Sequence, residues 1–207
     1  MTDTYCFLHL RGAGNNTQQL EQELIAVQSR WREQGVEIWG IWRGLFGVAS
    51  NELIVVASVA GDSPQEVFSA ELGALKLIRC SLFKPTLRPS SRASLEKPGI
   101  YVFRFFSVLP ENQAEFVELS GDAWTSFEGA HDYAAEPQGL FNEVRESGND
   151  PALDMLLVTW YDSLQSWQTS RAPADSARAR FVRRHQLTQR TVALATTLLP
   201  GVSAATD

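Results

Sequence analysis

An order of short motifs occurs twice along the chain, and this internal repeat restricts the fold more than any other feature of the sequence. Residues 5–11, Tyr-Cys-Phe-Leu-His-Leu-Arg, share Tyr-x-Phe with residues 101–107, Tyr-Val-Phe-Arg-Phe-Phe-Ser. Each copy later has an apolar run, over 53–56 and 155–158, and each ends in Thr-Leu-x-Pro. Two matching copies of about 100 residues predict a structural module that occurs in tandem.

Each copy has the pattern of a strand, a helix, two strands, a helix and a strand. Residues 17–33 and 116–127 carry apolar side chains every three or four positions, which predicts the first helix of each copy. A Ser-Pro-Gln-Glu sequence predicts a second helix of copy one from Ser63, because serine caps a free amide and proline needs no amide partner. In copy two, Ser163 or the aspartate before it is expected to cap a helix that breaks at Pro173 and then resumes.

The apolar runs indicate how the two copies are arranged. Residues 53–59 and 155–161 are apolar at nearly every position, so both faces of these strands are expected to be buried. One βαββαβ module covers only one face of its sheet with helices, and the other copy can cover the second face. We therefore expect an α+β fold of tandem ferredoxin-like βαββαβ modules, with antiparallel sheets packed as a dimeric-α/β-barrel-type pseudo-dimer. The modules are predicted over 1–90 and 99–200, followed by a flexible tail over 201–207.

Composition and charge argue against several classes of partner. The formal net charge of -6 is unfavourable for a nucleic-acid surface, which needs clustered Lys and Arg. Since the chain has neither a long apolar stretch nor a basic leader, we expect a cytoplasmic protein without membrane contact. Cys6 and Cys80 lie in apolar runs without the spacing of a zinc site, so they are expected to be buried thiols. No cofactor is expected.

Three motifs in the second copy match a known pattern. Residues 100–111 read Ile-Tyr-Val-Phe-Arg-Phe-Phe-Ser-Val-Leu-Pro-Glu, and further matches are Gly-Leu-Phe-Asn-Glu-Val at 139–144 and Trp-Tyr-Asp-Ser-Leu at 160–164. This copy resembles NIPSNAP-like proteins, whose opening strand is Tyr-x-x-Arg-x-Tyr before a Pro-Gly turn. Arg104 matches that strand, whereas Phe106 replaces its second tyrosine. The resemblance implies the dimeric α/β-barrel fold, which serves many activities and therefore implies no single one.

Arg104 is the residue of the second copy that says most about function. It shares a strand face with apolar side chains, where a charge is costly unless it is paired. One hypothesis is that Arg104 forms an ion pair with Glu143 on a neighbouring strand. The other is that its planar guanidinium binds the carboxylate of a ligand. Leu8 takes the equivalent position in copy one, so any charged pocket is expected in copy two. The aromatic residues predicted to line that pocket are Trp124, Phe127, Trp160 and Tyr161.

Two histidines are candidates for chemistry. His131 lies between a helix and a strand and precedes an aspartate, so it is a candidate general base. His185 follows Phe181 by four residues on one helix face and is a candidate axial ligand for haem. Its neighbours Arg183 and Arg184 instead indicate a solvated helix face, with acidic residues of the same copy neutralising the arginines.

These patterns leave three functional hypotheses open. The first is a NIPSNAP-like protein that binds a small apolar or carboxylate-bearing molecule in the second module, with or without transforming it. The second is a structural or assembly protein with a filled core and no ligand. The third is a haem-binding protein or a cofactor-independent monooxygenase of the same fold. Self-association into a homo-oligomer is expected if sheet edges stay exposed.

Overall fold

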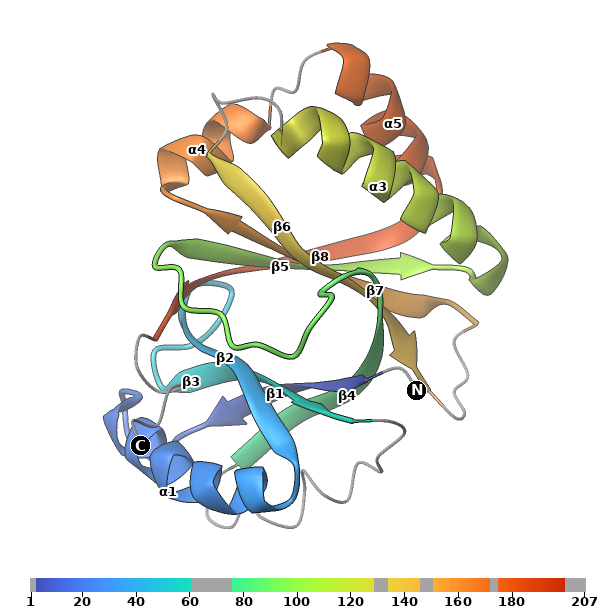
Figure 1. Ribbon diagram of the computed structural model, residues 1–207. Helices are drawn as coiled ribbons and strands as arrows, with labels where there is room; N and C mark the ends of the chain where they lie inside the picture. Colours follow the sequence, from blue (N-terminus) through green and yellow to red (C-terminus); the bar gives the residue numbers. More distant parts are fainter. Residues whose placement is uncertain (1–2, 61–75, 129–133, 146–150, 172–174, 200–207) are drawn as a thin grey trace. The chain divides into compact units, whose positions relative to one another are not determined.

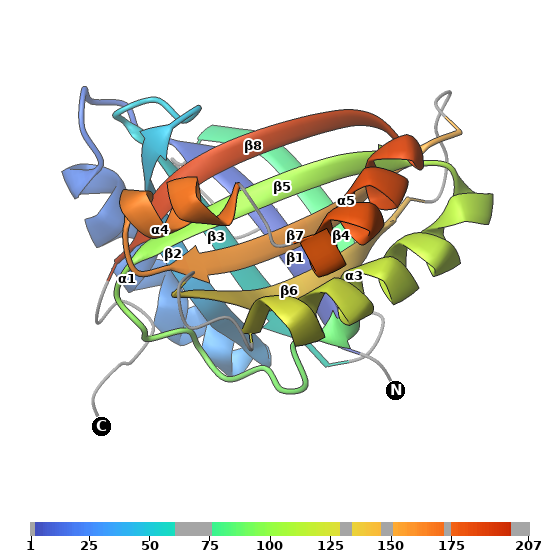
Figure 2. The same cartoon turned by 90° about the horizontal axis from the view of Figure 1, so that it is seen from above.

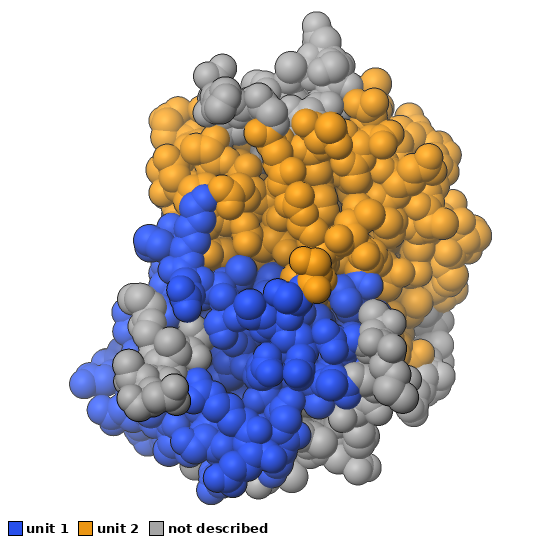
Figure 3. Space-filling model, viewed as in Figure 1, with its two compact units in different colours: residues 1–85, 91–98, 194–207 blue, residues 86–90, 99–193 orange. Residues whose placement is uncertain are grey.

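The chain forms two compact units, which the computed structural model describes over residues 3–60, 76–128, 134–145, 151–171 and 175–199 (Figures 1 and 3). Unit 1 contains the described residues up to Pro85, residues 91–98 and residues 194–199. Unit 2 contains residues 86–90 and 99–193. The boundary therefore falls inside two long strands, β4 and β8, each of which contributes to both units.

Unit 1 is an antiparallel sheet with a helix on one face. Its elements are β1 (Thr4–Arg11), α1 (Gln18–Glu33), β2 (Val36–Phe46), β3 (Glu52–Val59) and the first part of β4 (Lys76–Arg88). The hydrogen-bonded order is β4-β1-β3-β2, and the end of β8 (Thr188–Leu198) pairs with β2, with Trp42 opposite Leu198. The helix predicted from Ser63 lies outside the described residues.

The sheet of unit 1 is buried on both faces. Under α1, the side chains of Leu20, Leu24 and Trp31 pack against Leu8 and Val55 of the sheet. On the opposite face, alternate residues are equally buried, and they include Tyr5, Phe7, Trp39 and Trp42. Every residue of β3 is buried. This confirms the expectation that the apolar runs belong to strands with no face in water.

Unit 2 repeats the arrangement of unit 1. Its elements are β5 (Ile100–Val108), a short 3-10 turn (Pro110–Asn112), α3 (Gln113–Glu128), β6 (Ala135–Val144), β7 (Leu153–Tyr161), α4 (Leu164–Ser170), α5 (Asp175–Gln186) and the first part of β8. The strand order is β8-β5-β7-β6-β4, and the pairs of β7 with β5 and β6 are antiparallel. All three helices lie on one side of this sheet (Figures 1 and 2).

The second helix of unit 2 is interrupted where the sequence indicates. Ser163 caps α4, since its Oγ accepts a hydrogen bond of 3.1 Å from the backbone N of Ser166. The helix ends at Ser170 and a new one begins at Asp175, although the predicted break at Pro173 itself lies outside the described residues. α5 ends at Gln186, and β8 begins at Thr188.

A glycine followed two residues later by an aromatic residue occurs at the same place in each unit. A β-bulge precedes Gly40 in β2, and another precedes Gly139 in β6. A Cβ atom at Gly40 would lie 2.3 Å from the ring of Trp42, and one at Gly139 would lie 2.4 Å from the ring of Phe141. Each glycine therefore lets the aromatic ring two residues later lie against its own strand.

The observed architecture is the predicted α+β fold, with two copies of one antiparallel module. Among the described residues, none of the helices combines the length and apolar character that crossing a bilayer requires.

Candidate functional site

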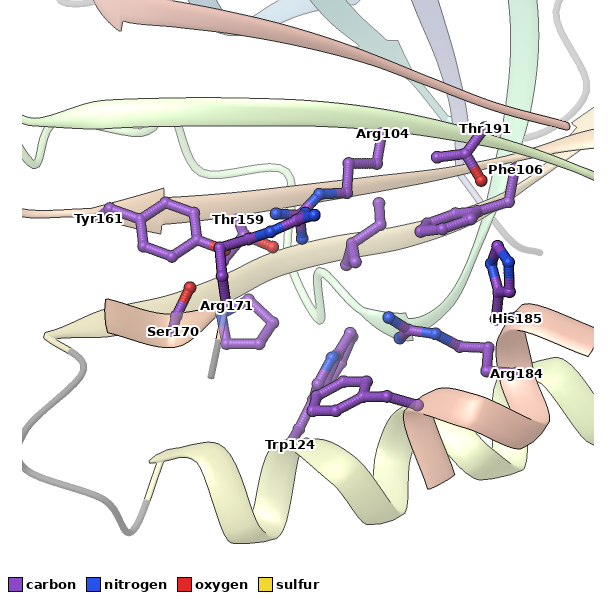
Figure 4. A pocket seen from close by; sticks show the side chains of 13 residues that line it. Arg104, Phe106, Trp124, Thr159, Tyr161, Ser170, Arg171, Arg184, His185 and Thr191 are labelled. Carbon is purple, nitrogen blue, oxygen red and sulfur yellow. The ribbon is translucent and has the colours of Figure 1, made fainter. Parts of the chain in front are cut away.

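A cavity of about 370 Å³ lies in unit 2, between the sheet and its helices (Figure 4). This volume is in the range of small-molecule sites. Its apolar lining residues are Phe106, Trp124, Pro137, Leu157 and Phe181. Its basic lining residues are Arg104, Arg171, Arg184 and His185, and hydroxyl groups come from Thr159, Tyr161, Ser170 and Thr191. The described part of this lining contains no carboxylate.

Strand register places Arg104 inside the cavity. Arg104 of β5 lies opposite Leu157 of β7, and Leu157 lies opposite Leu140 of β6 on its other side. Leu157 and Leu140 belong to the core under α3, so this row of side chains faces the helices. Figure 4 shows the guanidinium of Arg104 extending into the cavity from this row.

The predicted ion pair between Arg104 and Glu143 does not form. The Oε2 atom of Glu143 accepts a hydrogen bond of 3.0 Å from the backbone N of Asp154 and lies 3.9 Å from Nη2 of Arg145. Leu140 faces the helices, so alternation along β6 turns residue 143 to the other face. Within the described part of the chain, Arg104 has no hydrogen bond or ion pair with another side chain.

Arg184 on α5 is a second cation at the cavity, and it is only 9% exposed. Its Cζ lies 5.2 Å, 5.4 Å and 5.1 Å from the ring centroids of Phe106, Phe116 and Phe181. Its Nη1 donates a 3.3 Å hydrogen bond to Oγ of Ser120. Burial, and then the positive charge of Arg104, lower the pKa of Arg184 to about 10, so it remains charged at neutral pH.

The burial of Arg184 corrects the expectation that this arginine run is wholly solvated. Two of its neighbours do pair with acidic residues of α3: Nε of Arg183 lies 2.6 Å from Glu115, and Nε of Arg180 lies 3.5 Å from Asp122. Arg184 points the other way. The sequence does contain a signal for the burial of Arg184. Phe181 and Leu187, three residues before and after Arg184, are both apolar, and residues at this helical spacing lie on the same side.

Two of the four predicted aromatic residues line the cavity. Trp124 and Tyr161 do so, whereas Trp160 does not, because adjacent residues of a strand point to opposite faces. The side chain of Phe127 lies outside the described residues. Arg88 packs against Trp124, with its Cζ 5.2 Å from the centroid of the tryptophan ring. The Nη1 atom of Arg88 also donates a hydrogen bond of 2.9 Å to the carbonyl of Pro137.

The two histidine candidates have different outcomes. His131 lies outside the described residues, so its predicted role as a general base stays a prediction. His185 occupies the last turn of α5 and lines the cavity, although it is also exposed to solvent. Among the residues that the structure describes, no three His, Cys, Asp or Glu side chains gather as a metal site would require.

Solved structures share this fold. An anthrone oxidase-like protein is 16% identical with a TM-score of 0.61, over 95% of this chain and 91% of that chain. A putative chlorite dismutase is 12% identical with a TM-score of 0.61, over 96% of both chains. A heme-binding protein from Thermus thermophilus is 13% identical with a TM-score of 0.58, over 98% of this chain and 92% of that chain.

These likenesses define the fold class, the dimeric α/β barrel, in a form where two modules lie in one chain. At such identities they establish the fold alone. Neither a protein-family model nor a curated protein matches the sequence.

Proposed function

We propose that unit 2 binds a small molecule with a mostly apolar body and a carboxylate group. The observation that carries this proposal is Arg104, whose guanidinium enters the cavity from an apolar strand face and has no carboxylate partner in the described residues. An uncompensated charge in an apolar setting is costly, and a guanidinium is well matched to a carboxylate. A ligand acid in this position would complete the pairing.

The rest of the cavity fits the apolar body of such a ligand. Phe106, Trp124 and Phe181 present aromatic surface, and the hydroxyl groups of Thr159 and Tyr161 offer a few polar contacts. We include in this proposal the resemblance of the second copy to NIPSNAP-like proteins, since Arg104 is one of the residues that carry it. The open volume also favours ligand binding over a purely structural protein with a filled second module.

Thermal unfolding with a matched pair of ligands tests the proposal. The probes are 2-naphthoate, an aromatic acid, and 2-naphthamide, its neutral analogue of similar shape. Because a ligand that binds only the folded state raises the melting temperature, 2-naphthoate should raise the melting temperature of the wild-type protein more than 2-naphthamide does. The Arg104→Leu variant should lose the response to 2-naphthoate. Equal responses to both compounds, or none to either, would refute recognition of an acid.

Haem is a second candidate ligand, favoured by the position of His185 on the cavity wall. The lining fits the group in kind, because an imidazole can ligate iron, apolar side chains can contact the macrocycle and arginines can face its carboxylates. When bound, haem would supply redox chemistry that these side chains lack. Titration with hemin should give a Soret band that the His185→Ala variant does not give. Without such a band, the haem hypothesis is wrong and the proposal for a small acid stands.

A further inference from the structure

Arg184 faces the same cavity as Arg104, but from the opposite wall. Arg104 extends from β5 of the sheet, and Arg184 extends from α5 on the helical side of the cavity, with both guanidinium groups directed into the cavity (Figure 4). The positive charge of Arg104 is close enough to lower the pKa of Arg184. Two like charges thus line one cavity, where they repel each other, and an anion between them would relieve that repulsion.

The surroundings of Arg184 hold its guanidinium in place, and within the described residues they accept one hydrogen bond from it. The rings of Phe106, Phe116 and Phe181 surround the group, and aromatic faces attract cations. A guanidinium has five N–H donors, and the one hydrogen bond from Arg184 to a described residue goes to Ser120. The aromatic rings orient the group but accept no strong hydrogen bond, so its remaining donors can bind a ligand.

We infer that Arg104 and Arg184 form a two-sided clamp for one planar carboxylate, and that Arg184 determines the preference of the cavity for an acid over its amide. The ligand class is an aryl carboxylate whose ring system lies against Trp124 and Phe181. This inference rests on the proposed function and deepens it. It adds Arg184 of α5 to the recognition of the acid, which in the proposed function depends on Arg104 of the sheet.

A purely structural role for Arg184 makes a different prediction. If the group served only to pack α5 against three aromatic rings, its replacement would weaken binding of the acid and of the amide alike. A clamp acts on the acid only. The ratio of the affinity for the acid to the affinity for the amide therefore distinguishes a clamp from a packing role. A general loss of packing weakens both affinities and leaves their ratio unchanged.

The neighbouring Arg183 provides a matched control. It has the same side chain on the same helix, but it is exposed and pairs with Glu115 at 2.6 Å instead of lining the cavity. The Arg183→Gln variant removes the same charge from the same helical turn. Long-range electrostatic effects of a lost arginine should appear in both variants, whereas direct contact with the ligand acid should appear only at position 184.

Isothermal titration calorimetry of the full chain with 2-naphthoate and 2-naphthamide tests the clamp. A hydrogen bond to a charged partner is strong enough that Arg184→Gln should weaken 2-naphthoate binding by about tenfold or more. Binding of 2-naphthamide should change little, so the acid-to-amide ratio should fall by a similar factor. The ratio for Arg183→Gln should equal that of the wild type. Arg184→Lys should give an intermediate ratio, because lysine keeps the charge without the planar fork.

The outcomes separate the clamp from the proposed function. Loss of 2-naphthoate binding in Arg104→Leu with an unchanged ratio in Arg184→Gln would overturn the role of Arg184 and leave the proposed function intact. A wild-type protein that binds the acid no better than the amide would overturn both. If Arg184→Gln does not fold, as judged by circular dichroism, Arg184→Lys decides the matter, and a wild-type ratio in that variant would overturn the inference.

Discussion

The helix-facing sides of the two sheets differ although their backbones correspond. In unit 1 the row of paired residues is Leu8, Val55 and Ile41, and in unit 2 the equivalent row is Arg104, Leu157 and Leu140. Leu8 is fully buried under α1, whereas Arg104 opens into a cavity. One module thus uses this space for an apolar core, and the other leaves it open around charged groups. Under the proposed function, the same fold serves stability in one copy and ligand binding in the other.

Buried charge follows the same division. In unit 1, the carboxylate of Glu52 accepts hydrogen bonds from Arg11, from the backbone N of Ala49 and from the ring of His9. In unit 2, Arg104 and Arg184 have no carboxylate partner among the described residues. Unit 1 compensates its buried charge within the chain, which is the usual requirement for a stable core. Under the proposed function, the carboxylate of a ligand would supply that compensation in unit 2.

The largest effect is expected from giving unit 1 the charge of unit 2. Leu8→Arg would place an unpaired guanidinium in a filled core, which should lower the free energy of unfolding by about 3–5 kcal/mol. Leu8→Met, which nearly conserves volume, should cost less than about 1.5 kcal/mol. Urea unfolding followed by circular dichroism measures both. If Leu8→Arg cost no more than Leu8→Met, the two copies would not differ in how they tolerate charge.

The next largest effect is expected from larger side chains, which should destabilise the protein more in unit 1 than in unit 2. Ala57 and Thr159 occupy equivalent positions, opposite Cys6 and Val102, but Ala57 is in the packed core and Thr159 lines the cavity. Ala57→Leu should cost about 1–3 kcal/mol through overpacking, whereas Thr159→Leu should cost less than about 1 kcal/mol because open volume receives the side chain. Thermal and urea unfolding measure the difference. Equal costs would mean that the space beside Thr159 is not open.

A smaller effect of opposite sign is expected from giving unit 2 the leucine of unit 1. Arg104→Leu removes a half-buried charge that has no partner in the described chain, so without ligand it should raise the free energy of unfolding by about 1 kcal/mol. The same variant should lose binding of 2-naphthoate. A loss of several kcal/mol of stability would instead show that Arg104 has an essential structural partner.

The smallest effect is a pH dependence that comes from Glu52 of unit 1. Burial alone would raise the pKa of Glu52, but hydrogen bonds from Arg11, Ala49 and His9 outweigh it and hold the pKa below its ordinary value of 4.5. Glu52 therefore adds stability above about pH 4.5, and this contribution is lost as the pH falls through its lower value in the folded protein. The stability difference between the wild type and Glu52→Gln should shrink on acidification below pH 5. A difference that stays constant would contradict the pKa direction.

The sequence predicted the elements better than it predicted which side chains meet. The repeat, the helix cap at Ser163 and the doubly buried strands follow from local patterns, and the structure confirms them. The pairing of Glu143 was wrong because Leu140 faces the helices and alternation turns Glu143 to the other face of β6, whereas the sequence alone does not indicate which residues of β5 and β6 share a face. Both Trp160 and Tyr161 were expected in the pocket because a strand that is apolar on both faces does not indicate which face lines a cavity.

Arg184 was missed for a different reason. A run of arginines usually marks a solvated helix face, and two neighbours in this run do pair at the surface of α3. Its burial depends on three rings, and two of them come from β5 and α3, far from α5 in the sequence. Local periodicity places Arg184 next to Phe181, but it contains no information about Phe106 or Phe116.

Native mass spectrometry of the wild type and of Arg104→Leu, each mixed with 2-naphthoate, tests most directly whether the second copy holds an acid-binding cavity. The predicted result is one 2-naphthoate for each wild-type chain and none for the variant. The reason is that binding of the acid depends on the guanidinium of Arg104, and the variant has leucine there, as copy one has at Leu8. Equal occupancy of the two proteins, or no occupancy of the wild type, would contradict the division of roles between the copies.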